Sequence, residues 1–208
     1  MKKLFSFFLA LCFGLTAMAQ SQELVIVALN DVHAQIDNFP KLAAYISSLR
    51  ASNENVIVMN AGDNISGNPY VDCAADKGEP MYRLLNAVGA DFGNHDFDND
   101  QENLGRRIKQ ANFPMICANM DPSKTKDLRF KPYAILKTKG GIEVAVVGLI
   151  GMGGNGLPQS HPKHFRDIVF SNPVTTACEY VKLKKPGTVL VALSHCGVKD
   201  DKKIAAAC

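Results

Sequence analysis

The feature that most constrains this chain is a repeated pattern in which a short apolar run ends in a polar cluster. Three clusters occur in the first half: Asp31-Val32-His33, Gly62-Asp63-Asn64, and Gly93-Asn94-His95-Asp96 with Asp98 close behind. A later apolar run ends at His195. In α/β sheets, binding and catalytic groups gather at the carboxyl ends of the strands. The pattern therefore predicts one site assembled from several strand ends.

Apolar runs with alternating or continuous hydrophobicity predict strands, and runs with a period near 3.6 predict helices. The turn Lys139-Gly140-Gly141 predicts that two of the strands form a hairpin. Strands that alternate with helices favour an α/β fold with mixed β-sheets and flanking helices. We expect strands at 23–29, 55–60, 113–118, 133–138, 143–150 and 188–193, and helices at 39–51, 80–88, 98–110, 172–185 and 198–207.

The first residues are typical of a secretory signal peptide. Lys2 and Lys3 precede an apolar run from Leu4 to Leu15, and Ala17-Met18-Ala19 has the small-x-small pattern of a cleavage site. This predicts cleavage after Ala19 and an exported protein, periplasmic or extracellular, with a single domain over 20–208. The run is short for a membrane-spanning helix, although an uncleaved N-terminal anchor is the alternative.

Charge and cysteine content narrow the function classes. Without Lys2 and Lys3, 21 basic residues balance 20 acidic ones, so nothing in the net charge favours nucleic acid as a partner. The five cysteines after residue 19 lie far apart and form no CxxC motif, which argues against a zinc–thiolate site. We expect mostly buried, small apolar cysteines with at most one bridge.

The polar clusters offer oxygen and imidazole ligands of the kind that bind divalent cations. Asp31 and His33 would face the same side of an extended segment, and Asp63 could bridge two cations with its two oxygens. Asn94 offers an amide oxygen and His195 an imidazole. This donor set suits two ions of zinc, manganese or iron, which could together hold a phosphate ester.

His95 and Asp98 are the candidate catalytic residues. His95 follows the proposed ligand Asn94, so it can stand near the metals without binding them, and Asp98 can orient its imidazole. Each motif alone has an ordinary structural explanation: Gly62-Asp63 is common turn chemistry, Asp98 is a candidate helix N-cap, and His195 could be a buried core histidine. The prediction of a metal site rests on all of these motifs occurring together, in this order along the chain.

Two further motifs favour structural explanations. The segment 151–156 fits GxGxxG, but Pro158 and Pro162 interrupt the stretch where a nucleotide-binding fold needs a helix. His161 and His164 form an H-x-x-H on the same proline-rich loop, which favours surface histidines. We expect mobile surface loops at 124–129 and 151–166.

Taken together, Asp-x-His, Gly-Asp, Gly-Asn-His-Asp-Phe-Asp and Leu-Ser-His resemble the ordered motifs of the calcineurin-like metallophosphoesterases. The nearest branch resembles the exported 5′-nucleotidases, and the similarity runs from about Leu24 to Cys208. The resemblance implies a two-sheet sandwich with outer helices, a four-layer arrangement. It also implies hydrolysis of a small-molecule phosphoester, often a nucleotide.

The same resemblance implies a division of labour among the site residues. It places Asp31, His33 and Asp63 in one metal site, and Asp63, Asn94 and His195 in the other. It matches His95 and Asp98 to the family's catalytic histidine–aspartate pair.

The chain departs from the family pattern in two places. The family's Gly-His-x-His motif and nucleoside-binding domain are not found, which predicts a C-terminally incomplete domain without its last strands. The strand before Gly93 is shortened to little more than Phe92, which predicts displacement of Asn94 and His95. Two hypotheses follow: an exported metal-dependent phosphohydrolase, or a truncated, catalytically impaired relative that only binds metal or is non-enzymatic.

Overall fold

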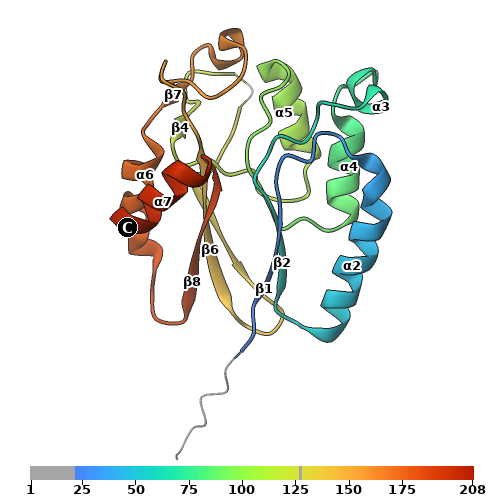
Figure 1. The fold of residues 1–208 in the computed structure, drawn as a ribbon, viewed down its shortest axis with the longest axis vertical. Helices are drawn as coiled ribbons and strands as arrows, with labels where there is room; N and C mark the ends of the chain where they lie inside the picture. The colour runs from blue at the N-terminus through green and yellow to red at the C-terminus, as the bar shows by residue number, and fades with distance from the viewer. Residues whose placement is uncertain (1–21, 127) are drawn as a thin grey trace, which may run out of the picture.

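Two three-stranded sheets lie face to face at the centre of the protein (Figure 1). The structure is a computed structural model that describes residues 22–126 and 128–208. The first sheet is parallel and has the order β1 (Val25–Leu29), β2 (Val56–Asn60), β3 (Phe92–Gly93). The second sheet is mixed and has the order β5 (Tyr133–Lys137), β6 (Glu143–Ile150), β8 (Thr188–His195). A small antiparallel pair joins β4 (Met120–Asp121) to β7 (Val169–Phe170).

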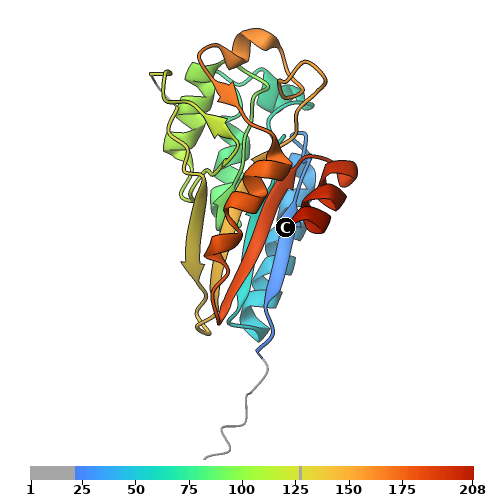
Figure 2. The same cartoon turned by 90° about the vertical axis from the view of Figure 1, so that its left-hand side faces the viewer.

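Helices cover the outer faces of both sheets, which gives four layers (Figures 1 and 2). On the side of the first sheet lie α2 (Phe39–Ser52), α3 (Pro69–Asp72), α4 (Glu79–Ala87) and α5 (Gln101–Gln110). On the side of the second sheet lie α6 (Pro173–Glu179) and α7 (Val198–Ala207). Three short 3-10 helices are η1 (Ile36–Asn38), η2 (Pro162–Phe165) and η3 (Val181–Leu183). The predicted mixed α/β class with flanking helices is confirmed.

The alternation of side chains along β2 explains the layers. Ile57 and Met59 point into the core between the two sheets, whereas Val58 packs with the helices outside. β6 behaves in the same way, because Val146 faces the inter-sheet core and Leu149 packs toward α6 and α7. Strands that are apolar on both faces are expected in sheets buried on both sides.

Most predicted elements are confirmed, including the hairpin of β5 and β6. Three predictions were wrong in detail. Residues 113–118 form only isolated bridges at Met115 and Ile116, because Pro114 has no N–H to donate to a ladder. The helix expected over 172–185 stops at Glu179 and continues as η3. Helix α5 begins later than expected because Asp100, not Asp98, accepts the capping bond from the Asn103 N–H at 2.8 Å.

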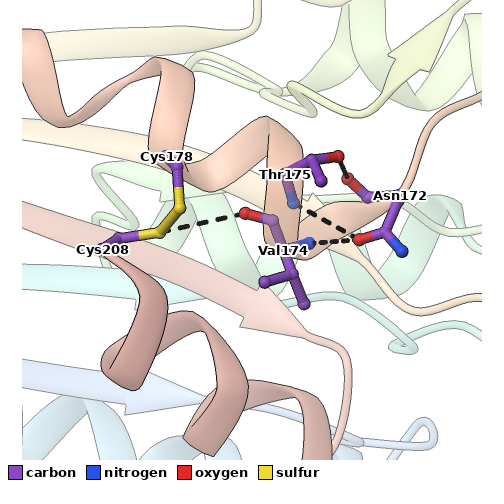
Figure 3. Close-up of a disulfide and its surroundings, with 5 residues drawn as sticks. All are labelled: Asn172, Val174, Thr175, Cys178 and Cys208. Carbon is purple, nitrogen blue, oxygen red and sulfur yellow. Dashed lines mark hydrogen bonds between the residues drawn. A yellow bond between two sulfur atoms is a disulfide. The ribbon is translucent and has the colours of Figure 1, made fainter.

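The five cysteines after residue 19 form one bridge, as expected, but only Cys117 among them is buried, which corrects the expectation of mostly buried cysteines. One disulfide joins Cys178 on α6 to Cys208 after the end of α7, and Asn172 caps α6 by accepting bonds from the N–H groups of Val174 and Thr175 (Figure 3). Cys117 is buried, while Cys73 is exposed and free.

The predicted signal peptide, residues 1–19, lies outside the described residues. Within 22–126 and 128–208, none of the helices has the length and apolar character needed to cross a bilayer.

Candidate metal centre

The loops that follow β1 and β2 are joined by backbone hydrogen bonds. The N–H groups of Asp31, His33 and Ala34 donate to the carbonyl oxygens of Gly62, Asp63 and Asn64 at 3.2, 3.2 and 2.7 Å. The loop after β3 is tied in as well, since the Asp63 N–H donates to the His95 carbonyl at 3.4 Å. Three of the predicted clusters therefore meet at one edge of the first sheet.

This junction forces an uncommon backbone on the candidate ligands. Asp31, His33, Ala34 and Asp63 all have positive φ, between 45° and 58°. Such conformations cost about 1–3 kcal/mol each in non-glycine residues and concentrate at functional sites. The argument that Asp31 and His33 share a face of an extended segment was wrong. They are brought together by the left-handed turn that the bonds to the β2 loop impose.

Three of the five predicted metal ligands converge. A carboxylate oxygen of Asp31, one of Asp63 and an imidazole nitrogen of His195 all lie within 4.8 Å of one another. His195 ends β8, and its Nε2 is 3.1 Å from Asp31 Oδ1. His33 lies beside the same carboxylates, with its Nε2 3.5 Å from Asp63 Oδ2 and 3.9 Å from Asp31 Oδ1.

The donor chemistry of this cluster fits a divalent cation. Burial raises the pKa of Asp63, and the nearby negative charge of Asp98 raises it further, against the lowering effect of His33. Carboxylates packed this closely favour a positive charge between them. Two carboxylates with imidazoles, and no thiolate, make the mixed set that suits zinc, manganese or iron.

The side chain of Asn94 forms hydrogen bonds with two strands of the second sheet and with its own loop. It follows the two-residue β3, and its buried side-chain amide donates to the carbonyls of Leu149 and Leu193 at 2.9 and 3.2 Å. Its side-chain oxygen accepts from the N–H of His95 at 2.9 Å. In this conformation the Asn94 amide fastens the first sheet to the second. The shortened strand is present, paired with β2 through Phe92 and Gly93.

His95 lies beside the converging donors. Its ring centroid is 5.0 Å from that of His195, and its buried Nδ1 has no hydrogen-bond partner among residues 22–126 and 128–208. Burial, and to a lesser degree His195, lower the pKa of His95 to about 3. Asp98 is near but is not bonded to this ring nitrogen; its carboxylate accepts from Ser66 Oγ at 2.6 Å.

Asp96 has a structural role beside the site that the sequence did not predict. Its carboxylate, 1% exposed, accepts from the N–H and side-chain amide of Asn64 at 2.6 and 2.8 Å and from the Tyr82 hydroxyl at 2.8 Å. Burial raises its pKa to about 7, although these bonds oppose the shift. Asp96 thus clamps the segment that carries Asp63, and no sequence signal singles out this role.

The cluster opens into a cleft of about 1110 Å³. The residues that line it include His33, Asp63, His95, Asp98 and His195. Residues of the glycine-rich segment 151–160 line it as well, although this segment was expected only as a mobile surface loop. As predicted, no helix starts at the GxGxxG sequence. Asn155, Leu157 and Gln159 from this segment, together with Ser66, also line the cleft. No motif in the sequence marks these residues as part of the site.

Of the two histidines in the H-x-x-H motif, one is exposed and the other is buried. His161 is exposed and caps η2 by accepting from the Lys163 N–H at 3.2 Å. His164 is buried, 8% exposed, which corrects the expectation of two surface histidines. Its burial follows from a hydrogen bond to the carbonyl of Phe97 at 2.8 Å.

The chain is similar to known proteins in both sequence and fold. Residues 24–206 match the calcineurin-like phosphoesterase family. Protein UshA of Yersinia enterocolitica is 35% identical over 160 residues, which are 74% of this chain and 28% of the relative. The 5′-nucleotidase of Bos taurus is 31% identical over 90% of this chain and 36% of its own length. The chain thus spans about a third of the length of these relatives.

Solved structures show the same fold. A 5′-nucleotidase precursor from Thermus thermophilus superposes with a TM-score of 0.73 at 23% identity, covering 88% of this chain and 39% of that one. The calcineurin-like phosphoesterase YfkN from Bacillus subtilis gives 0.63 at 25% identity, with 84% and 62% covered. Because the family model matches residues 24–206, the chain belongs to the calcineurin-like phosphoesterase family.

Proposed function

We propose that this chain forms the metal-binding part of an exported phosphohydrolase of the 5′-nucleotidase type. The observation that carries the proposal is the convergence of Asp31, Asp63 and His195 donor atoms within 4.8 Å, at the floor of a large cleft. Similarity to UshA and to a 5′-nucleotidase favours a nucleotide or another small phosphoester as substrate. The domain would span 20–208, after a signal peptide over 1–19.

The proposed centre holds two divalent cations of the zinc, manganese or iron type. Asp31, His33 and Asp63 would hold one, and Asp63, Asn94 and His195 the other. The Asn94 side-chain oxygen accepts one bond from the His95 N–H, and its second lone pair is available to a cation in the second site. Bound cations would neutralise phosphate charge and acidify water.

The protein's own groups would handle the leaving group. His95 lies in the cleft next to the donors, where it can exchange a proton with the departing oxygen. A phosphate beside its ring would carry negative charge and so raise the His95 pKa from the low value that burial imposes. Asp98 lines the same cleft, where its carboxylate accepts a hydrogen bond from Ser66 Oγ at 2.6 Å.

The test is metal-dependent phosphoester hydrolysis, followed as phosphate release from AMP and as p-nitrophenol release from bis-p-nitrophenyl phosphate. Residues 20–208 are stripped with chelator and assayed with AMP and bis-p-nitrophenyl phosphate, with and without Mn²⁺ or Zn²⁺. We expect hydrolysis only with metal, and its loss in Asp63→Ala but not in Asp37→Ala, an exposed control on η1. Hydrolysis that is equal with and without metal would refute the proposal. Metal binding without hydrolysis would favour the impaired relative instead.

A further inference from the structure

The buried half of the H-x-x-H motif contacts the segment that carries the proposed catalytic pair. His164 Nδ1 is 2.8 Å from the carbonyl oxygen of Phe97, and Ser160 Oγ donates to the same oxygen at 2.7 Å. A carbonyl oxygen can only accept, so His164 Nδ1 must carry the proton in this contact. Two donors from one loop therefore fix a single peptide group.

Phe165, which follows His164 in the chain, contacts the side chain of Phe97. The Phe165 ring meets the Phe97 ring edge-on, with centroids 5.1 Å apart and planes at 67°. η2 itself is tied to the start of α5, because the Gln101 amide donates to the carbonyls of His164 and Arg166 at 3.0 and 2.6 Å. The segment 160–165 therefore contacts both the backbone carbonyl and the ring of Phe97. Hydrogen bonds from Gln101 hold this segment in place.

Phe97 connects this segment to the site. It lies between His95 and Asp98 in the chain, and its ring is stacked on His95 with centroids 6.1 Å apart at 28°. Within the described part of the chain, His95 Nδ1 has no hydrogen-bond partner, so packing against Phe97 and His195 orients the ring. A shift of the Phe97 peptide would move both His95 and Asp98.

We propose that His164 and Ser160 are positioning residues that set His95 and Asp98 in the cleft by holding the Phe97 carbonyl. The inference rests on the roles of His95 and Asp98 in the proposed hydrolysis. The two residues act through Phe97 and not through the metal donors. Their loss should therefore change turnover without changing metal affinity.

The chain offers a matched set of variants. His164→Leu removes the donor and keeps apolar bulk, whereas His164→Asn places an amide N–H near the position of Nδ1. Ser160→Ala removes the second donor from a half-buried side chain, so it also serves if His164→Leu fails to fold. His161→Asn is the control, because asparagine keeps an acceptor for the cap of η2.

Three readouts are measured on residues 20–208: kcat and KM for AMP with Mn²⁺, Mn²⁺ affinity by calorimetry, and the NMR signal of the His95 ring. The NMR signal is recorded on the metal-free protein, because paramagnetic Mn²⁺ would broaden it. Only five histidines are present, so ring signals can be assigned by single substitutions. We expect His164→Leu to lower kcat by about ten- to a hundredfold and to shift the His95 signal, with Mn²⁺ affinity unchanged. His164→Asn should restore kcat to within about threefold, and Ser160→Ala should shift the His95 signal in the same direction.

Two results would overturn the inference. One is an unmoved His95 signal in His164→Leu and Ser160→Ala. The other is a parallel fall of Mn²⁺ affinity and kcat in His164→Leu and His164→Asn, which would indicate a general structural role. If the wild-type chain hydrolyses neither AMP nor bis-p-nitrophenyl phosphate, the proposed function fails. The His95 signal then still decides whether the loop orients this ring.

Discussion

Replacing Asp96 with alanine should destabilise the fold by about 3–5 kcal/mol. Asp96, Asn64 and Tyr82 are all at most 2% exposed, and the substitution leaves three donors without their carboxylate. A buried donor that loses its partner costs about 1–3 kcal/mol. The sum is reduced because burying the carboxylate is itself unfavourable, as its raised pKa shows, and because water can enter the space left by the side chain.

The assay is urea unfolding of residues 20–208, followed by circular dichroism in the presence of chelator. Tyr82→Phe is the matched control, because it removes one of the three bonds and should cost about 1 kcal/mol. A loss below about 1 kcal/mol for Asp96→Ala, or an equal loss for the two variants, would refute the view that Asp96 is the hub of this junction.

Three further changes have defined outcomes. Gly62→Ala should weaken Mn²⁺ binding, because Gly62 has φ +105° and an added Cβ would lie 2.2 Å from the His95 carbonyl oxygen; unchanged Mn²⁺ affinity by calorimetry would contradict this. Cys208→Ser should cost about 3 kcal/mol in urea unfolding, because the bridge to Cys178 closes a separation of 30 residues; an unchanged midpoint would contradict it. Cys196→Ser should change AMP turnover by less than about twofold, since burial raises the pKa of this thiol to about 11 and keeps it protonated; abolished turnover would assign the thiol a chemical role.

The ends of the strands could be predicted because they depend on short stretches of sequence: the spacing of apolar residues and the polar residues that follow them. β2 and β6 are apolar on both faces, and the Gly62-Asp63 cluster follows the first of them. Parallel pairing then brings Ile150 into register with His195 and Asn60 with Gly93. The general location of the candidate site followed from this pattern alone.

The local geometry of the site was not predictable, since it depends on contacts between distant segments. The left-handed backbone at Asp31 and His33 follows from bonds to the Gly62 and Asp63 carbonyls, which no property of the Asp-x-His triplet encodes. The Asn94 amide binds carbonyls 55 and 99 residues away. His164 is buried because of a similarly distant bond to Phe97.

Metal content of two variants tests the central claim most directly. Residues 20–208 carrying Asp63→Ala or His95→Ala are titrated with Mn²⁺, and bound metal is measured beside AMP turnover. We predict that Asp63→Ala weakens Mn²⁺ binding at least about tenfold, whereas His95→Ala keeps metal affinity and loses about a hundredfold or more in turnover. Equal loss of metal in both variants, or full metal binding in Asp63→Ala, would contradict the assigned roles.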